Sequence, residues 1–187
     1  MNNLKIGFFG GCFNPPTIAH IELAKKTIEI AGLDKIVFIP MGDCYPKSDL
    51  ISIKHRYEML KIAIKDENKM EISDMQFRQK NITYAIDTFR KIDEIYSCEK
   101  YFIMGTDNFA QLKNWKESDK LKNYKLIILE RKEKIIDNDN VIFVDSDEFK
   151  NVSSKEIREQ LKNKEEKITF LKKEVLEYIQ KNNLYSD

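Results

Sequence analysis

Continuous apolar runs alternate along this chain with segments of helical periodicity. An unbroken apolar run predicts a buried strand, whereas apolar residues spaced three or four apart predict a helix. Strands are expected at residues 4–9, 35–40, 69–73, 100–105, 124–130 and 141–146. Helices are expected at residues 17–32, 53–66, 82–96, 106–115, 152–161 and 169–183, with Ile53, Tyr57, Leu60 and Ile64 sharing one face of the second.

The ends of several predicted helices carry local signals. Pro16 suits a first helical position and Gly32 suits a C-terminal stop. Thr106 or Asp107 is expected to be the N-cap of the fourth helix, because both side chains can accept a bond from a free helical N–H. The charged residues 131–140 are expected to form a solvated connection.

The alternation of strands and helices predicts an α/β fold: a doubly wound, mostly parallel sheet with helices on both faces. We expect residues 1–187 to form a single domain, of which residues 151–187 are a small C-terminal helical part. Sheets of this kind bind ligands at the carboxyl ends of their strands. The loops that matter most therefore follow Phe9, Pro40, Met104 and Val144.

The composition excludes several classes of protein. Of 187 residues, 42% are hydrophobic and 34% are charged, which is typical of a folded globule rather than a disordered chain. No apolar run reaches the roughly 18 residues of a membrane span, and the N-terminus lacks the pattern of a secretory signal. The formal net charge is +1, so no nucleic-acid or membrane partner is expected. We expect a cytoplasmic protein with small-molecule substrates; whether it is a homo-oligomer stays open.

Cysteine and histidine are scarce. The three cysteines, Cys12, Cys44 and Cys98, are odd in number and widely spaced, which argues against a disulfide framework or a structural zinc site. The two histidines, His20 and His55, are too few for a multi-histidine metal site. No protein-held metal is therefore expected.

The strongest functional signal is GGCFNPPTIAH, residues 10–20. Gly10 and Gly11 let backbone N–H groups approach a ligand closely, and the helix that follows offers an anion site at its N-terminus. Thr17 and His20 are three residues apart, so a hydroxyl and an imidazole share the first turn. The spacing disfavours a dinucleotide-binding Rossmann enzyme and a P-loop enzyme. The alternative is a simple glycine turn with His20 packed in a helix.

A second signal, VSSKEIR, covers residues 152–158. Ser153 with Glu156 fits a capping box. The hydroxyls of Ser153 and Ser154, the free N–H groups of the helix and Arg158 together suit a polyphosphate. Taken alone, this segment is better interpreted as an ordinary capped helix with a surface arginine.

Together the two segments resemble the signatures of the nucleotidyltransferase superfamily, G-G-T-F-D-P-x-H-x-G-H early and I-S-S-T-x-I-R late. Within it the chain most resembles the bacterial nicotinate mononucleotide adenylyltransferases. Further matches follow in the order GLDKIVFIP, HRYEMLKIAI, TYAIDT, FIMGTDNFAQLKNW and YIQKNNLY, so the resemblance covers nearly the whole chain.

The resemblance implies a Rossmann-like nucleotidyltransferase fold and adenylyl transfer from ATP to nicotinate mononucleotide, with release of pyrophosphate, in NAD biosynthesis. No covalent enzyme intermediate is implied, and Mg²⁺ is expected to neutralise the polyphosphate of ATP.

By matched position the resemblance implies an ATP site and an acceptor site. The ATP site would comprise Gly10, Gly11, Cys12, Phe13, His20, Gly105, Asp107, Ser153, Ser154 and Arg158. The acceptor site would comprise Lys47, Thr83, Tyr84 and Trp115. The tryptophan would stack on the pyridine ring. His20, Thr17 and Arg158 are the expected catalytic residues, acting by positioning and by stabilising charge.

The sequence departs from the family pattern at several of these positions. Thr17 replaces the first histidine of H-x-G-H and Ala19 replaces its glycine. The P-P-H-K loop has no histidine here, and S-Y-T ends in Ala85, whose side chain donates no hydrogen bond. A site that lacks a polar contact discriminates less between substrates.

Several alternatives therefore stay open. The acceptor could be nicotinamide mononucleotide, phosphopantetheine or another phosphate ester, and Thr17 slightly favours the phosphopantetheine enzyme. A non-catalytic nucleotide-binding relative is a further alternative. A class I aminoacyl-tRNA synthetase fragment is disfavoured, because the chain lacks K-M-S-K-S and is too short to hold tRNA-binding domains.

The resemblance also implies that two thiols lie at the cleft. Cys12 and Cys44 are expected to face it and Cys98 to be remote. Because phosphate-binding N–H groups favour a thiolate, the pKa of Cys12 is expected to be lowered.

Overall fold

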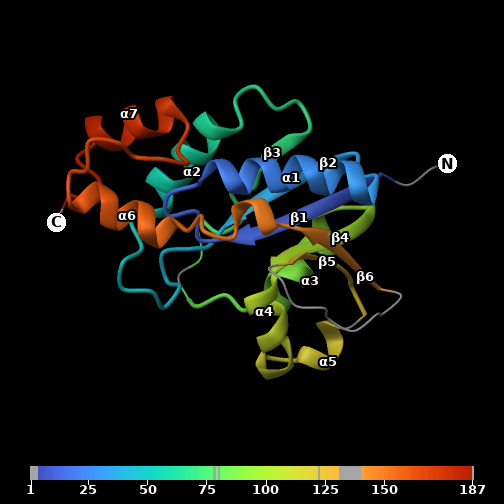
Figure 1. The fold of residues 1–187 in the computed structure, drawn as a ribbon. Helices are drawn as coiled ribbons and strands as arrows, with labels where there is room; N and C mark the ends of the chain where they lie inside the picture. The colour runs from blue at the N-terminus through green and yellow to red at the C-terminus, as the bar shows by residue number, and fades with distance from the viewer. Residues whose placement is uncertain (1–3, 78, 80, 122, 131–139, 187) are drawn as a thin grey trace.

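The computed structural model describes residues 4–77, 79, 81–121, 123–130 and 140–186 (Figure 1). Six strands form one sheet within that part of the chain: β1 Lys5–Gly11, β2 Lys35–Pro40, β3 Met70–Ile72, β4 Glu99–Gly105, β5 Lys125–Glu130 and β6 Val141–Asp145. The α-helices are α1 Ile18–Ala31, α2 Ile53–Ala63, α3 Ala85–Ile95, α4 Thr106–Gln111, α5 Ser118–Leu121, α6 Ser154–Lys162 and α7 Lys173–Lys181. Two short 3-10 helices, η1 Leu112–Asn114 and η2 Asp147–Phe149, complete the described elements.

The sheet confirms the doubly wound prediction. Its strand order is β3-β2-β1-β4-β5-β6, and every pair is parallel. The chain winds outward from β1 to β3 and then returns to place β4 beside β1. The winding direction therefore changes between β1 and β4, and a crevice opens outside the carboxyl ends of strands at such a point.

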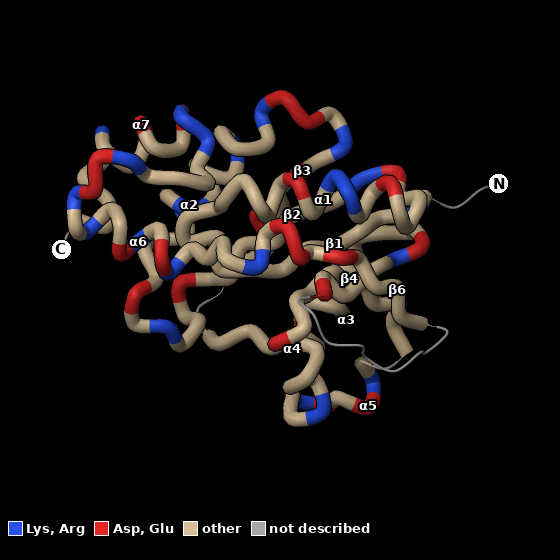
Figure 2. The backbone as a smooth tube through the Cα atoms, in the orientation of Figure 1, with Lys and Arg blue, Asp and Glu red and all other residues tan. Residues whose placement is uncertain are grey.

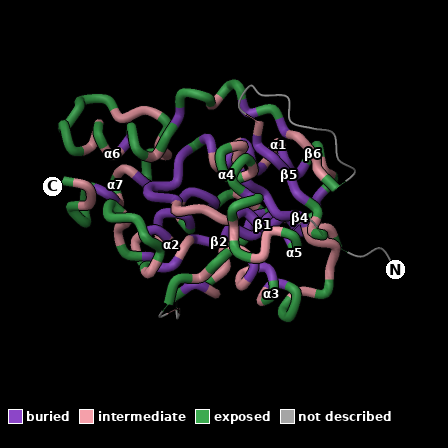
Figure 3. The backbone as a smooth tube through the Cα atoms, turned by 90° about the horizontal axis from the view of Figure 1, so that it is seen from below, coloured by how far each residue is buried: buried purple, intermediate pink, exposed green. Residues whose placement is uncertain are grey.

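Each face of the sheet is covered by its own apolar cluster. Phe9, Ile36 and Ile103 pack against α1, α2 and α7 on one face. Phe8, Val37 and Phe102 pack against α3, η1 and α5 on the other. Neighbouring residues of a strand point to opposite faces, so the continuous apolar runs bury both sides, as Figure 3 shows for the central strands.

The helix ends agree only in part with the sequence prediction. Gly32 ends α1 at φ 59, in the left-handed region that favours glycine, as predicted. Pro16 is not the first helical residue, because Thr17 is extended and caps α1 with its side chain. The N-cap of α4 is Gly105 rather than Thr106 or Asp107, because the helix already begins at Thr106.

Several helices are shorter than predicted. Helix α3 begins at Ala85 because Tyr84 is extended. Helix α7 begins at Lys173, since Phe170 has φ 61 and cannot be helical. Helix α2 ends at Ala63; of the four residues predicted to share one face, Ile53, Leu60 and Ile64 are buried and Tyr57 is half-buried. Residues 131–139 of the predicted charged connection lie outside the described residues.

The described part of the C-terminal segment, residues 151–186, contributes to the same core as the sheet. Val175 and Ile179 of α7 are buried in the cluster that contains β1 and α1. Charged residues of both signs are spread over the helices and outer loops (Figure 2).

Candidate active site

A cavity of about 250 Å³ lies at the carboxyl ends of β1 and β4. Its walls come from the loop after β1, the start of α1, the start of α4 and the segment that follows β6. Of the predicted ATP-site residues, Gly10, Gly11, Phe13, His20, Gly105 and Asp107 line it, and so does Thr17, which was predicted to be catalytic. The structure thus brings together residues nearly 100 positions apart at the crevice that the topology predicts.

The loop after β1 packs against the ring of its own residue Phe13. Phe13 is buried, and its ring centroid lies 5.6 Å from that of Phe9 and 5.1 Å from that of His20. A Cβ on Gly11 would lie 2.9 Å from the Phe13 ring, so only glycine fits this position without displacement. Gly10 has no atom within 4 Å of such a Cβ and leaves the backbone open toward the cavity.

Thr17 and His20 form one unit at the start of α1. The Thr17 backbone N donates to His20 Nδ1 at 2.9 Å, and Thr17 Oγ1 lies 2.7 Å from the same nitrogen. Because Nδ1 accepts from a backbone N–H, the proton of the neutral imidazole belongs on Nε2. This tautomer makes Nε2 a donor at the wall of the cavity.

Of the late motif only Val152 lines the cavity, whereas Ser154 and Arg158 contact the first loop. Ser154 Oγ donates to the Pro15 carbonyl at 2.8 Å, and Arg158 Nη1 donates to the Asn14 carbonyl at 2.8 Å. Arg158 Nη2 forms an ion pair with Asp49. Ser153 caps α6 by accepting from Glu156 N at 3.1 Å. The arginine lines a neighbouring cavity of about 530 Å³ between α6 and residues 48–51.

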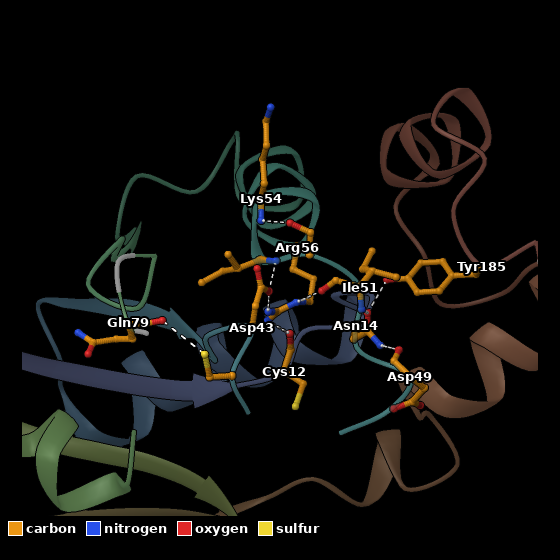
Figure 4. Close-up of polar contacts among 12 residues, drawn as sticks. Cys12, Asn14, Asp43, Asp49, Ile51, Lys54, Arg56, Gln79 and Tyr185 are labelled. Atoms are coloured by element: carbon orange, nitrogen blue, oxygen red, sulfur yellow. Dashed lines mark hydrogen bonds and ion pairs between the residues drawn. The ribbon is translucent and has the colours of Figure 1, made fainter. Parts of the chain in front are cut away.

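Arg56 is a structural element of this site that sequence reasoning missed. Its side chain is fully buried, and it donates to the Ile51 carbonyl at 2.8 Å, to the Cys12 carbonyl at 3.0 Å and to Asp43 Oδ1 at 3.1 Å (Figure 4). It therefore ties α2 to the loop after β1 and to the loop after β2. Burial lowers the pKa of Arg56, and the bond to Asp43 opposes that shift. Arg56 is one of several charged residues in the sequence of α2, and nothing there indicated this role.

A second, smaller cavity of about 70 Å³ adjoins the first and shares Gly10 and Asn108 with it. Trp115, a predicted acceptor-site residue, lines this second cavity, and so does Ala85. Polar side chains are supplied by Gln76, whose Nε2 donates to Thr88 Oγ1 at 3.1 Å, and by Thr88 itself.

The other predicted acceptor residues lie outside this second cavity. Lys47 is exposed on the loop after β2. Tyr84 is 47% exposed, and Lys116 Nζ lies 4.8 Å from its ring centroid. Thr83 is half-buried just before α3.

The expected lowering of the Cys12 pKa was wrong. Burial raises the pKa of the Cys12 thiol, and the nearby charges of Lys47, Arg56 and Arg158 offset that rise only in part. Cys44 Sγ donates to the Gln79 carbonyl at 3.6 Å. The thiol of Cys12 is therefore protonated near neutral pH.

Comparison with known proteins identifies the family. Residues 8–160 match the family model described as cytidylyltransferase-like. A protein of Borreliella afzelii called "Probable nicotinate-nucleotide adenylyltransferase" is 37% identical over 190 residues, covering 97% of each chain. The chain belongs to the nicotinate-nucleotide adenylyltransferase family. It is a nucleotidyltransferase, as its first and late motifs suggested.

Other members of the nicotinate-nucleotide adenylyltransferase family agree. A protein of the same name from Fusobacterium nucleatum is 32% identical and covers 95% of this chain and 98% of its own. The structure of nicotinic acid mononucleotide adenylyltransferase from Plasmodium falciparum, complexed with NaAD, superposes with a TM-score of 0.84 at 25% identity over 97% of each chain.

Two further observations describe this family member. None of the helices in the described ranges is long and apolar enough to cross a membrane. In the same part of the chain, no three His, Cys, Asp or Glu side chains gather in a way that could hold a metal ion.

Proposed function

We propose that this chain transfers the adenylyl group of ATP to nicotinate mononucleotide, producing nicotinate adenine dinucleotide and pyrophosphate in NAD biosynthesis. The observation that carries the proposal is the pair of adjoining cavities, which share Gly10 and Asn108. One is walled by a phosphate-type loop and His20, and the other by apolar side chains and Trp115. Group transfer between two bound substrates requires this side-by-side arrangement. The names of the relatives and the NaAD bound to the Plasmodium falciparum structure support it.

ATP is proposed to occupy the larger cavity. Its phosphates would lie over residues 10–13 and the N-terminus of α1, where free N–H groups attract anions. Its adenosine would lie beside Gly105 and Asp107, which begin α4. Arg158, together with Ser153 and Ser154 at the N-terminus of α6, would bind the β- and γ-phosphates. To do so, Arg158 would exchange the Asp49 carboxylate for the polyphosphate.

The proposed reaction is a single in-line displacement. A phosphate oxygen of the mononucleotide attacks the α-phosphorus of ATP, a new P–O bond forms, and the bond to pyrophosphate breaks. The Nε2–H of His20 would donate to the α-phosphate oxygen on which charge develops, while Thr17 holds Nδ1. Stabilising charge with a preoriented donor lowers the barrier without a proton transfer by the enzyme.

Mg²⁺ is proposed to enter as part of the substrate, MgATP. Mg²⁺ is usually held by one or two carboxylates together with substrate phosphates. Among the described residues that line the larger cavity, Asp107 supplies the carboxylate. That donor set fits an ion carried mainly by the phosphates, whose charge it would neutralise.

The acceptor is proposed to lie in the smaller cavity, with its pyridine ring on Trp115. Lys47, Thr83 and Tyr84 would reach it from the loops after β2 and before α3. The described lining also favours a second candidate acceptor, nicotinamide mononucleotide, because Gln76, Thr88 and Asn108 are its polar side chains and all three are uncharged. We propose that the enzyme acts in the cytoplasm on these small molecules.

Pyrophosphate release tests the proposal. The chain would be assayed with MgATP and, separately, nicotinate mononucleotide, nicotinamide mononucleotide or phosphopantetheine, and the dinucleotide product would be identified by mass. We expect the highest kcat/KM with nicotinate mononucleotide. Preference for nicotinamide mononucleotide would favour the second candidate. ATP binding without pyrophosphate release from any acceptor would contradict enzymatic transfer.

A further inference from the structure

The C-terminal tail turns back from α7 toward the loop after β1. Asn183 N donates to the Gln180 carbonyl at 3.2 Å and Leu184 N to the Ile179 carbonyl at 3.1 Å. Asn183 and Tyr185 have φ 50 and φ 61, in the left-handed region that asparagine adopts readily and a bulky residue such as tyrosine rarely does. The chain accepts this unfavourable backbone while its last aromatic ring, that of Tyr185, packs against the main core cluster.

The phenol of Tyr185 reaches the side chain of Asn14. Its hydroxyl donates to Asn14 Oδ1 at 2.8 Å (Figure 4). Burial raises the pKa of Tyr185 far above its ordinary value, so the hydroxyl stays protonated and able to donate throughout the range in which enzymes are assayed.

Asn14 is 1% exposed, and both Oδ1 and Nδ2 of its amide form hydrogen bonds. Ile51 N donates to Oδ1 at 3.4 Å, and Nδ2 donates to the Asp49 carbonyl at 2.7 Å. Two donors therefore face the oxygen and one acceptor faces the nitrogen, which defines the orientation of the amide. Of the two donors, the phenol makes the shorter bond.

The backbone of Asn14 lies where three parts of the chain meet. Its carbonyl accepts from Arg158 of α6, and the carbonyl of Cys12, two residues earlier, accepts from Arg56 of α2. Two prolines follow it, and their fixed φ angles leave little freedom to absorb a displacement. A shift at Asn14 therefore passes along the chain to Thr17, which holds the ring of His20.

We propose that Tyr185 is a positioning residue for adenylyl transfer: by fixing the amide of Asn14, its hydroxyl sets the conformation of the loop after β1 and thereby the orientation of His20. The kinetic part of this inference rests on the function proposed above. The effect of Tyr185 on His20 does not, and it can be measured on the ligand-free protein.

The chain offers a matched control in Tyr178. Its hydroxyl lies 3.0 Å from Nδ1 of His55, at the contact between α7 and α2. The chain has two histidines. His55 contacts Tyr178 directly, whereas His20 is proposed to depend on Tyr185 through the loop after β1. Tyr178→Phe and Tyr185→Phe each remove one hydroxyl from the C-terminal part and keep the aromatic ring.

The test combines kinetics with NMR of the histidine rings. In Tyr185→Phe we expect the ring nitrogen resonances of His20 to shift and those of His55 to stay unchanged, with the reverse in Tyr178→Phe. We expect kcat to fall about tenfold in Tyr185→Phe, as for one lost hydrogen bond of about 1.4 kcal/mol. The KM for ATP should change much less, and kcat should be retained in Tyr178→Phe.

A double-mutant cycle with Asn14→Ala examines the route of the effect. If Tyr185 acts through Asn14, adding Tyr185→Phe to Asn14→Ala should lower kcat no further. Unchanged His20 resonances in Tyr185→Phe would overturn the proposal, whatever reaction the enzyme performs. Equal losses of kcat in both tyrosine variants would overturn it too, because they would indicate a general effect of the C-terminal part on folding.

Discussion

Replacing Arg56 by methionine should destabilise the fold and loosen the loop after β1. Methionine keeps much of the length of the side chain but donates no hydrogen bonds. Arg56 is fully buried, and it bonds to carbonyl oxygens of residues 12 and 51, before and after β2. Its third partner, the Asp43 carboxylate, has a side chain that is 53% exposed.

The magnitude follows from these three contacts. Each carbonyl that loses a buried donor costs about 1–2 kcal/mol. Asp43 contributes little, because water can replace the guanidinium at a half-exposed carboxylate. We therefore expect Arg56→Met to lower the free energy of unfolding by about 3 kcal/mol. For a chain of this size each kcal/mol corresponds to roughly 2–4 °C in Tm, so Tm should fall by about 9 °C.

Thermal unfolding of these variants would check the loss of stability, and ATP titration would check whether the loop after β1 is looser. Arg90→Met is the matched control, because Arg90 makes its ion pairs with Asp87 and Glu117 on the surface. That control should keep its Tm. Arg56→Lys should fall in between, because an ammonium cannot reach all three acceptors at once. A Tm for Arg56→Met within about 2 °C of the wild type, or an equal loss in Arg90→Met, would refute the reasoning.

Three further predictions concern the cavities. His20→Ala should lower kcat by about 10²–10³-fold and change the Kd for ATP little, since its donor matters where charge develops; a loss of ATP binding with kcat intact at saturation would assign His20 to ligand holding. Trp115→Ala should raise the KM for the mononucleotide about tenfold, whereas Trp115→Phe retains stacking; an unchanged KM would remove Trp115 from the acceptor site. Burial holds the pKa of Cys12 above its ordinary 9.0, so its alkylation should be slow at pH 7 and accelerate as the pH rises past 9.0. ATP should slow the alkylation. A rate indifferent to pH or to ATP would contradict the placement of Cys12 in the loop proposed to bind ATP.

Periodicity was a reliable guide to the core and a poor guide to helix ends. All six predicted strands exist, because a buried parallel strand must be apolar on both faces and this leaves an unbroken run. The ends of α3, α4 and α7 were predicted wrongly. A single extended or left-handed residue can end a helix, and the spacing of apolar residues gives no sign of it. The short α5 lacks the length over which periodicity can be recognised.

The first motif was found from local spacing. GGCFNPPTIAH needs its glycines and its helix start next to one another in the chain, so a glycine pair before a helical pattern is enough to indicate an anion site. The unit of Thr17 and His20 is equally local, because three residues of helix bring the two side chains together.

The amino-acid sequence by itself therefore determined the α/β architecture, the position of the phosphate-type loop and the family. Tertiary structure alone decided what supports that loop. Arg56, Arg158 and Tyr185 converge on residues 12–14 from α2, α6 and the C-terminal tail, at separations of 44, 144 and 171 residues. Contacts across such separations depend on how helices pack on the sheet, and no local pattern encodes them. The same packing partly buries Cys12 and raises the pKa of its thiol, the reverse of what its neighbours in the sequence suggested.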